Sequence, residues 1–280
     1  MGLDLEMNIS RNAPQGDAAS AGRITRLVEP PIGWLVIDNE PRLNAISLDM
    51  WKAIPAAVRD LDQNDQVRVI VLRGAGDKTF ISGADISEFA ETRKNAECAR
   101  AYENENSAAF DALRDCKKPT IAMIRGFCMG GGLGLSAACD MRFAARGSCF
   151  SIPAARLGIG YPVRAISDLT ALVGPARTKD LFFSARRIDA EEAAAIGLVE
   201  RLFDESDLEA ETRTYAQSVA ANAPLVLRAA KAAINAVACA NVTADWSSLN
   251  ELNDICFDSE DFTEGRNAFL ERRTPRFTGR

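Results

Sequence analysis

The stretch GFCMGGGLGLSAACD, residues 126–140, contains three consecutive glycines, and no charged side chain occurs from Gly126 to Cys139. The pattern predicts that a strand ends and a helix begins at the glycines. A helix start presents unpaired N–H groups and the positive end of the helix dipole, and glycine lets another group approach the backbone closely. These features suit an anion or a developing oxyanion, although glycine clusters are also typical of tight turns and close helix packing.

A second segment with a similar pattern, FISGADISEF at residues 80–89, follows an expected strand at 67–74 after a loop. It too places a small residue and a glycine ahead of an expected helix start. Two N–H groups from separate segments can converge on one oxygen, which is the arrangement that stabilises an oxyanion. The two segments together therefore favour an oxyanion site over a purely structural use of the glycines.

Short apolar runs before residue 205 indicate buried strands. Helical stretches begin near Ser47 and Glu91, between these runs, and the alternation predicts an α/β core with crossover connections. Pro55 lies inside the first helical stretch, so we expect a kink or a late start there. The runs are GWLVIDN (33–39), VRVIVLRG (67–74) and PTIAMIRG (119–126).

Two later helices have clear boundary signals. In GPARTKDLFFSA, Pro175 follows Gly174 and suits a first helical position. In DAEEAAAIG, Asp189 is the expected N-cap and Gly197 the expected stop.

The chain changes character near Glu205, because only two of its 19 glycines, Gly265 and Gly279, lie beyond that point. The alanine-rich region 205–280 predicts three or four helices, one of them opened by Pro224. So few helices form only a thin core, and we expect them to pack against the main domain, 23–204, or another subunit. Residues 1–22 are polar and are expected to form a loose tail. Apolar residues recur at helical spacing at Leu249, Leu252, Ile255 and Cys256.

The composition argues against several classes of partner. The 39 acidic and 33 basic residues give a net charge of -6 without a basic stripe, so we expect no nucleic-acid partner. No apolar run of about 18 residues could span a bilayer, and the polar start does not resemble a signal peptide, so no membrane association is expected. The seven cysteines form no C-x-x-C pair. They are expected to be reduced thiols, which implies a cytoplasmic location.

The chain contains no histidine. Its absence excludes Ser-His and Cys-His nucleophile pairs, histidine general bases and histidine-ligated zinc, and the cysteines offer no metal-binding spacing. Any acid or base must therefore be Asp, Glu, Tyr, Lys or Cys, and no metal site is expected.

Several motifs, in order and correctly spaced from about residue 23 to the C-terminus, resemble those of the crotonase superfamily, the enoyl-CoA hydratase and isomerase group. Besides the glycine stretch, these motifs are RLNAIS (42–47), FISGADI (80–86), PAARLGI (153–159), SARRIDAEEAAAIGLV (184–199) and EGRNAFLERRTPRF (264–277).

This resemblance implies a core of repeated ββα units and a helical C-terminal region that forms trimers, often paired into hexamers. It implies an acyl-CoA thioester substrate and no other cofactor. By position, the N–H groups of Ser82 and Gly131 would form the oxyanion hole, and a side chain at Gly131 should abolish the reaction while leaving the fold largely intact. The resemblance also assigns substrate contacts to Arg42, Asn44, Ala45, Ser82, Gly83, Ala84, Asp85, Ile86, Gly130, Gly131, Gly134 and Ala154.

The chain departs from the family where the hydratases carry two glutamates, because those positions match Gly134 and Ala154. Hydration needs groups that move protons at both carbons, and neither residue can do so. Tyr161 occupies a position where the methylmalonyl-CoA decarboxylase branch also has a tyrosine, although the histidine of that branch corresponds to Ala84. Tyr161 can equally be a packing residue.

Three hypotheses follow from these observations. The chain is a hydratase or isomerase that uses unusual groups or Tyr161, a decarboxylase of a malonyl-type acyl-CoA, or a catalytically weak acyl-CoA-binding protein. Tyrosine is a poor base at neutral pH, and decarboxylation forms an enolate without a base. Four further polar candidates have simpler explanations, namely Asp85 and Glu88 as caps or surface charges and Arg164 and Asp168 as a pair across one helical turn.

Overall fold

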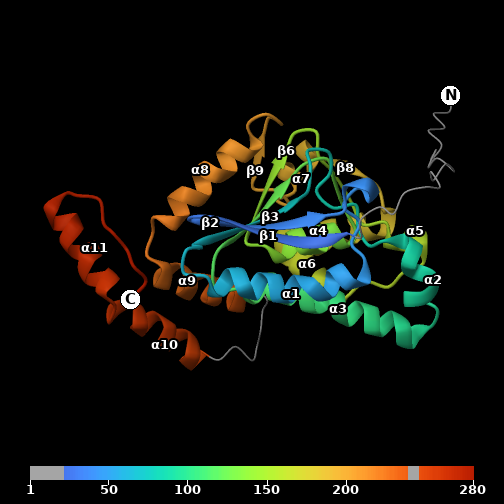
Figure 1. Cartoon of the computed structure of the whole chain (residues 1–280). Coiled ribbons are helices and arrows are strands. Elements are labelled where there is room, and N and C mark those ends of the chain that lie inside the picture. Colours follow the sequence, from blue (N-terminus) through green and yellow to red (C-terminus); the bar gives the residue numbers. More distant parts are fainter. Residues whose placement is uncertain (1–21, 239–245) are drawn as a thin grey trace.

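The main sheet lies at the centre of the computed structural model, which describes residues 22–238 and 246–280 (Figure 1). In this part of the chain it has six strands in the order β1-β2-β3-β4-β6-β9. β1 is antiparallel to β2, and the remaining neighbours pair in parallel. The strands are β1 (Arg23–Glu29), β2 (Ile32–Asp38), β3 (Val69–Gly74), β4 (Thr120–Ile124), β6 (Met141–Ala145) and β9 (Arg201–Phe203).

A smaller sheet of β5 (Phe127–Met129), β7 (Cys149–Ser151) and β8 (Ile188–Asp189) lies beside the main one. The chain leaves β4 and enters β5 almost directly, so consecutive strands belong to different sheets. A single bridge between Ile81 and Cys128 brings the loop that carries residues 80–86 against β5. The two segments singled out in the sequence are therefore neighbours in space.

Helices cover both faces of the main sheet, and alternate side chains of β2 face opposite sides, as the period of a strand requires. Leu35 and Ile37 belong to the core on the side of α1, whereas Trp34 and Val36 pack with residues of α8. The helices are α1 (Leu48–Gln63), α2 (Phe89–Thr92), α3 (Ala96–Asp115), α4 (Gly131–Ala138), α5 (Ala154–Leu157), α6 (Val163–Ser184), α7 (Ala190–Ala195), α8 (Leu208–Ala220), α9 (Pro224–Ala238), α10 (Trp246–Phe257) and α11 (Glu260–Glu271), with short 3-10 turns η1 (Glu40–Arg42) and η2 (Ile86–Glu88).

The expected strands and an α/β core with a helical C-terminal region are confirmed. Ser47 caps α1 by accepting a hydrogen bond from the Met50 N–H. The expectation of a late start at Pro55 is wrong, because α1 runs through this proline from Leu48. The helix expected near Glu91 is divided into α2 and α3, because Asn95 starts a new helix by capping the Cys98 N–H.

The later boundary signals are also confirmed. Gly174 interrupts α6 with φ 78°, and Pro175 starts its second half. Asp189 caps α7 through the Glu192 N–H, and Gly197 follows the helix with φ 83°. Pro224 opens α9.

The sequence predicts a boundary between residues 204 and 205. In the structure, α8, which follows this boundary, covers one face of the main sheet. Leu208 and Ala216 of α8 are completely buried against the main sheet, so α8 is part of the core layer. Most of the expected N-terminal tail, residues 1–21, lies outside the described residues, as does the side chain of Leu249 in the predicted apolar stripe.

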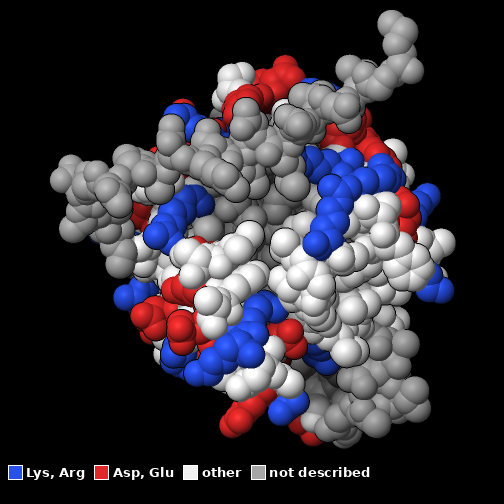
Figure 2. All heavy atoms as spheres, turned by 90° about the vertical axis from the view of Figure 1, so that its right-hand side faces the viewer, with Lys and Arg blue, Asp and Glu red and all other residues white. Residues whose placement is uncertain are grey.

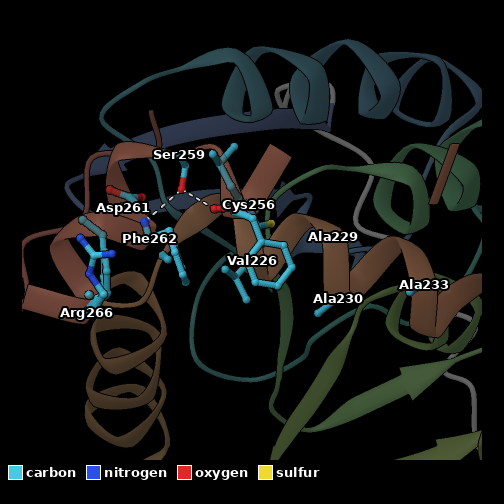
Figure 3. A pocket seen from close by; sticks show the side chains of 14 residues that line it. Val226, Ala229, Ala230, Ala233, Cys256, Ser259, Asp261, Phe262 and Arg266 are labelled. Carbon is cyan, nitrogen blue, oxygen red and sulfur yellow. Dashed lines mark hydrogen bonds between the residues drawn. The ribbon is translucent and has the colours of Figure 1, made fainter. Parts of the chain in front are cut away.

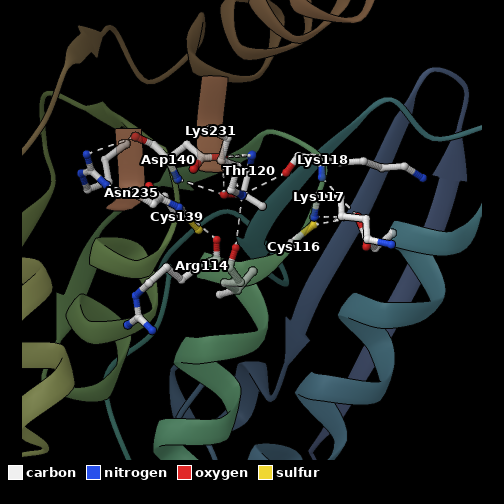
Figure 4. A network of polar contacts seen from close by, with 12 residues as sticks. Arg114, Cys116, Lys117, Lys118, Thr120, Cys139, Asp140, Lys231 and Asn235 are labelled. Atoms are coloured by element: carbon white, nitrogen blue, oxygen red, sulfur yellow. Dashed lines mark hydrogen bonds and ion pairs between the residues drawn. The ribbon is translucent and has the colours of Figure 1, made fainter. Parts of the chain in front are cut away.

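A polar network fixes α9 to the core, as Figure 4 shows. Lys231 of α9 donates to the carbonyl oxygen of Lys118 at 3.0 Å and forms an ion pair with Asp140 at 2.9 Å. Asp140 also accepts hydrogen bonds from the N–H and hydroxyl of Thr120. Because only 9% of the Lys231 side chain is exposed, these partners are needed to compensate the buried charge.

The described helices include none that is both long and apolar enough to cross a membrane. The described cysteines are all free thiols.

Candidate active site

A cavity of about 90 Å³ lies where the start of α4 meets η2, α2, α3 and α5. Three of these elements are short, so loops and helix ends form most of the wall. The cavity is lined by Ser82, Gly83, Ala84, Ile86, Phe89, Arg93, Asn106, Phe110, Gly130, Gly131, Ile152, Pro153, Ala154, Leu157, Ile159, Gly160, Tyr161 and Pro162.

The cavity brings together many of the residues expected at the substrate from three separate parts of the sequence. Five other expected residues do not line it, namely Arg42, Asn44, Ala45, Asp85 and Gly134. Their role as substrate contacts stays a prediction. The expected residues that do line the cavity are Ser82, Gly83, Ala84, Ile86, Gly130, Gly131, Ala154 and Tyr161.

The Asn44 side chain joins the loops around the cavity through hydrogen bonds. Its side chain is 1% exposed and donates to the carbonyl oxygens of Ala75 at 3.0 Å and Thr79 at 2.8 Å. Its amide oxygen accepts a hydrogen bond from the Asn39 N–H at 3.0 Å. The whole amide is therefore occupied in joining three loop segments.

Asp85 and Glu88, two further polar candidates, have hydrogen-bond partners within the fold. Asp85 accepts a hydrogen bond from the Ser87 N–H and forms an ion pair with Arg42. Burial opposes ionisation of Asp85, but the hydrogen bonds from Ser87 and Arg42 outweigh it and lower the pKa of this carboxyl. Glu88 accepts from the Leu48 N–H at 2.8 Å, so both carboxylates bind N–H groups at helix starts, which confirms the expectation of caps, although Asp85 is buried and is not a surface charge.

The expected pairing of Arg164 with Asp168 is wrong. Asp168 instead accepts hydrogen bonds from Arg114 of α3, including one at 2.9 Å, and both side chains are almost fully buried. Arg164 lies 3.7 Å from Asp111. The Arg114–Asp168 pair therefore joins α3 to α6 across the core.

The two expected oxyanion donors, the N–H groups of Gly131 and Ser82, differ in whether they already have a hydrogen-bond acceptor. Gly131 is the first residue of α4, and its N–H has no acceptor among the described residues. The Ser82 N–H donates to the Leu43 carbonyl oxygen at 3.2 Å, which is at the long end of the normal range. An anionic oxygen is the stronger acceptor and can compete for this donor.

The glycines at 130–132 allow close packing of neighbouring residues, in addition to leaving the backbone accessible. Gly130 has φ 48°, which disfavours any side chain, and a Cβ on Gly132 would lie 2.6 Å from the Ile81 carbonyl oxygen. A Cβ on Gly131 would lie 2.8 Å from the ring of Trp51, which is completely buried. The expectation that a side chain at Gly131 would leave the fold largely intact is therefore wrong.

Tyr161 and Phe110 occupy the space in front of Gly134. A Cβ on Gly134 would lie 2.7 Å from the Phe110 ring and 3.0 Å from the Tyr161 hydroxyl oxygen. The Tyr161 hydroxyl donates to the Gly130 carbonyl oxygen at 2.9 Å, and its ring packs edge-on against Phe182. The aromatic rings thus fill the volume that a larger side chain at position 134 would need.

Tyr161 stays protonated at neutral pH, because burial raises the pKa of its hydroxyl further above the usual value near 10. Its proton is already engaged by Gly130. This geometry makes Tyr161 a positioning group for the start of α4. It could act as an acid only by leaving that hydrogen bond.

Sequence analysis missed the wall contributed by α2 and α3, including Phe89, Arg93 and Asn106. One signal was available in α3, where Tyr102, Asn106, Phe110 and Leu113 follow helical spacing and all become buried. An amide inside an otherwise apolar helical face is unusual and indicates a partner or a site.

Comparisons with known proteins agree with this architecture. The family model described as enoyl-CoA hydratase/isomerase matches residues 32–280. A short-chain-enoyl-CoA hydratase from Clostridium acetobutylicum is 32% identical over 245 residues, which are 88% of this chain and 93% of the relative. A peroxisomal Delta(3,5)-Delta(2,4)-dienoyl-CoA isomerase from Arabidopsis thaliana is 33% identical over 254 residues, covering 87% of this chain and 91% of the relative.

Solved structures show the same fold. The crystal structure of an enoyl-CoA hydratase/isomerase family protein from Hyphomonas neptunium matches with a TM-score of 0.87 and 36% identity. The match covers 92% of this chain and 98% of the other. The expected crotonase fold is confirmed.

Replacing Gly134 with alanine tests the packing at the start of α4. Glycine to alanine inside a helix ordinarily stabilises by about 1 kcal/mol. Here the contact with Phe110 reverses the sign, and we expect a net loss of about 1 to 3 kcal/mol in the free energy of unfolding. Adding Phe110→Leu should recover part of the loss in a double-mutant cycle measured by denaturant unfolding. Gly147→Ala, in a turn where the added Cβ would lie 3.8 Å from the nearest atom of a distant residue, is the control for uncrowded addition of a methyl group. A more stable Gly134→Ala variant would contradict the packing argument.

Proposed function

Because the chain belongs to the enoyl-CoA hydratase/isomerase family of enzymes, we propose that it binds an acyl-CoA thioester and stabilises the thioester enolate with the N–H groups of Ser82 and Gly131. One observation carries the proposal: both residues line the same cavity, and the Gly131 N–H lacks an acceptor among the described residues. Removing one oxyanion donor typically costs about 100 to 1,000-fold in turnover.

Basic side chains on the face of the molecule near α2 and α5 suit a ligand that carries phosphates. Figure 2 shows Lys and Arg side chains at several points around uncharged surface on this face. Arg42, next to the Ser82 segment in the hydrogen-bond network, has a side chain that is 55% exposed. Coenzyme A brings phosphates that such side chains can pair with.

The reaction proceeds, in this proposal, without the two glutamates of the hydratases. None of the residues described as lining the cavity is Asp or Glu. Gly134 and Ala154 cannot move protons, and Tyr161 is a protonated donor. A site of this kind can hold an enolate but has no evident base to form one from a neutral acyl group.

Decarboxylation of a malonyl-type acyl-CoA is the second candidate, favoured by the same lack of carboxylates in the cavity wall. When the C–C bond to the carboxylate breaks, its electron pair passes to the thioester and forms the enolate, while CO2 leaves. The enolate then takes a proton at carbon from water or another acid. No base is needed to start this reaction. A catalytically weak acyl-CoA-binding protein is the outcome if no reaction occurs.

Infrared spectroscopy of a bound ligand tests the oxyanion hole without disturbing the tightly packed glycines. Butyryl-CoA labelled with 13C at the thioester carbonyl should show a C=O stretch at lower frequency when bound than in water, because two N–H groups polarise the carbonyl. The thioether S-butyl-CoA, which lacks the carbonyl oxygen, should bind more weakly. A bound C=O frequency equal to that in water, with both ligands bound equally, would refute the proposed oxyanion hole.

Hydration of crotonyl-CoA should be slow, by about 100 to 10,000-fold for each missing acid-base group, relative to enzymes that have both glutamates. Ala154→Glu places a carboxylate in the cavity wall and should raise the rate at least about tenfold. Ala155→Glu adds the same charge to the adjacent exposed residue and is the control. Rapid hydration by the unmodified protein, measured by loss of the enoyl absorbance, would show that another group supplies the acid and base.

We further propose that the chain assembles as a trimer or a dimer of trimers through its C-terminal helices. An apolar pocket of about 640 Å³ opens between α9, α10 and α11, where Val226, Ala230 and Phe262 lie together (Figure 3). Large apolar side chains on these helices are solvent-exposed in the single chain, including Ile234, Phe257 and Phe269 at 64%, 59% and 84%. Burying such a surface against another copy would be favourable.

Sedimentation equilibrium at micromolar concentration should give the mass of a trimer or a multiple of it. Phe257→Asp should shift the protein towards smaller species, because a buried charge in an apolar contact is costly. Leu157→Asp changes an exposed apolar residue far from these helices in the sequence and is the control. A monomer at these concentrations would contradict the proposed assembly.

A further inference from the structure

Arg93 and Asn106, two polar residues on the cavity wall near α2 and α3, take no part in the proposed oxyanion chemistry. Arg93 Nε and Asn106 Oδ1 are buried without a hydrogen-bond partner among the described residues, and both residues line the cavity. Leaving a buried polar atom unpaired is destabilising, and most proteins avoid it. The pair therefore calls for a ligand.

Aromatic rings hold the Arg93 guanidinium in place. Its central carbon lies 4.8 Å from the Phe89 ring centre and 4.7 Å from that of Tyr102. Glu103 is its ion-pair partner at 3.7 Å, a distance beyond hydrogen bonding. Only 14% of the Arg93 side chain is exposed. The cation is thus fixed by ring contacts while its N–H donors remain unused within the described chain.

Asn106 contributes an amide to the wall of the same cavity. The residue is 6% exposed and lies on the buried face of α3 between Tyr102 and Phe110. Because the oxygen and nitrogen of a carboxamide are assigned from their partners, the amide can turn its NH2 group towards an acceptor. Arg93 and Asn106 together offer a charged donor and a neutral donor to one anionic group.

We propose that Arg93 and Asn106 bind a carboxylate on the acyl chain, so that the substrate is the CoA thioester of a dicarboxylic acid. This inference rests on the proposed function, because it places the acyl group in the same cavity as Ser82 and Gly131. Arginine matches a carboxylate with two parallel hydrogen bonds. A site built around such a bond rejects the analogue that lacks the partner, because the buried donors are then left unpaired.

The carboxylate bound by Arg93 and Asn106 is not the group that a decarboxylation would release. An ion pair with Arg93 stabilises the carboxylate more than it stabilises neutral CO2, so it opposes loss of the group. The carboxylate held by Arg93 and Asn106 is therefore retained through the reaction and serves for recognition. The group that leaves in a decarboxylation would have to be another one.

Succinyl-CoA and butyryl-CoA have acyl chains of equal length and differ in the terminal carboxylate, so their dissociation constants test the proposal by isothermal titration calorimetry. The unmodified protein should bind succinyl-CoA about 10 to 100-fold more tightly. Arg93→Met should remove the preference, Arg93→Lys should retain part of it, and Asn106→Leu should reduce it. Arg100→Met, an exposed arginine on α3, should keep it. Circular dichroism checks that each variant is folded.

Equal affinities for the two ligands would overturn the carboxylate site while leaving acyl-CoA binding intact. Failure to bind either ligand would overturn the proposed function, and with it this inference. If Arg93→Met does not fold, the preference of the unmodified protein and its reduction in Asn106→Leu decide the question. A preference that survives in both Asn106→Leu and Arg93→Lys at full size would also count against the site.

Discussion

The close contact between the bare backbone of α4 and the aromatic rings around it is the constraint on which the site depends. Trp51 touches the position of Gly131, and Phe110 and Tyr161 touch that of Gly134. Trp51 and Phe110 also pack edge to face, and the Trp51 ring nitrogen donates to the Tyr102 hydroxyl at 2.9 Å. Because the rings meet the helix where no side chain intervenes, the first turn of α4 is held rigidly by α1 and α3. Its unpaired N–H groups are fixed before any ligand arrives.

Close packing and an unpaired backbone N–H group therefore occur at the same helix start. A glycine-rich helix start can approach a ring closely because it has no Cβ, and its first N–H groups are unpaired because no helical carbonyl oxygen precedes them. Hydrogen bonds to a developing charge are stronger in a water-poor environment than in bulk water. Fixed donors also need little reorganisation when the charge appears.

Much of the fold could be predicted from local signals, and the site only in part. Asp189, Pro175 and Pro224 mark helix starts because capping and the missing N–H of proline act within a few residues. The motifs around Ser82 and Gly131 could be placed together because their resemblance to a known family covers most of the chain. The wall that contains Arg93 and Asn106 could not be predicted, because it depends on how α2 and α3 pack over the cavity. The contact of Gly131 with Trp51 joins residues far apart in sequence, and no local pattern reports it.

Among the described residues, the cavity wall contains a cation, Arg93, and no carboxylate. Ala154 brings no charge to the wall, while Arg93 brings a positive charge that lacks a hydrogen-bonded partner in the described chain. A carboxylate wall repels an anionic acyl group and favours proton transfer, whereas a wall with a fixed cation attracts an anionic group and stabilises negative charge formed nearby. Tyr161 supplies no base to this wall, because its raised pKa keeps the hydroxyl neutral, and it also occupies space in front of Gly134. Ala154, Tyr161 and Arg93 are therefore physically consistent with one another, since together they make the cavity better suited to an anion than to general-base chemistry.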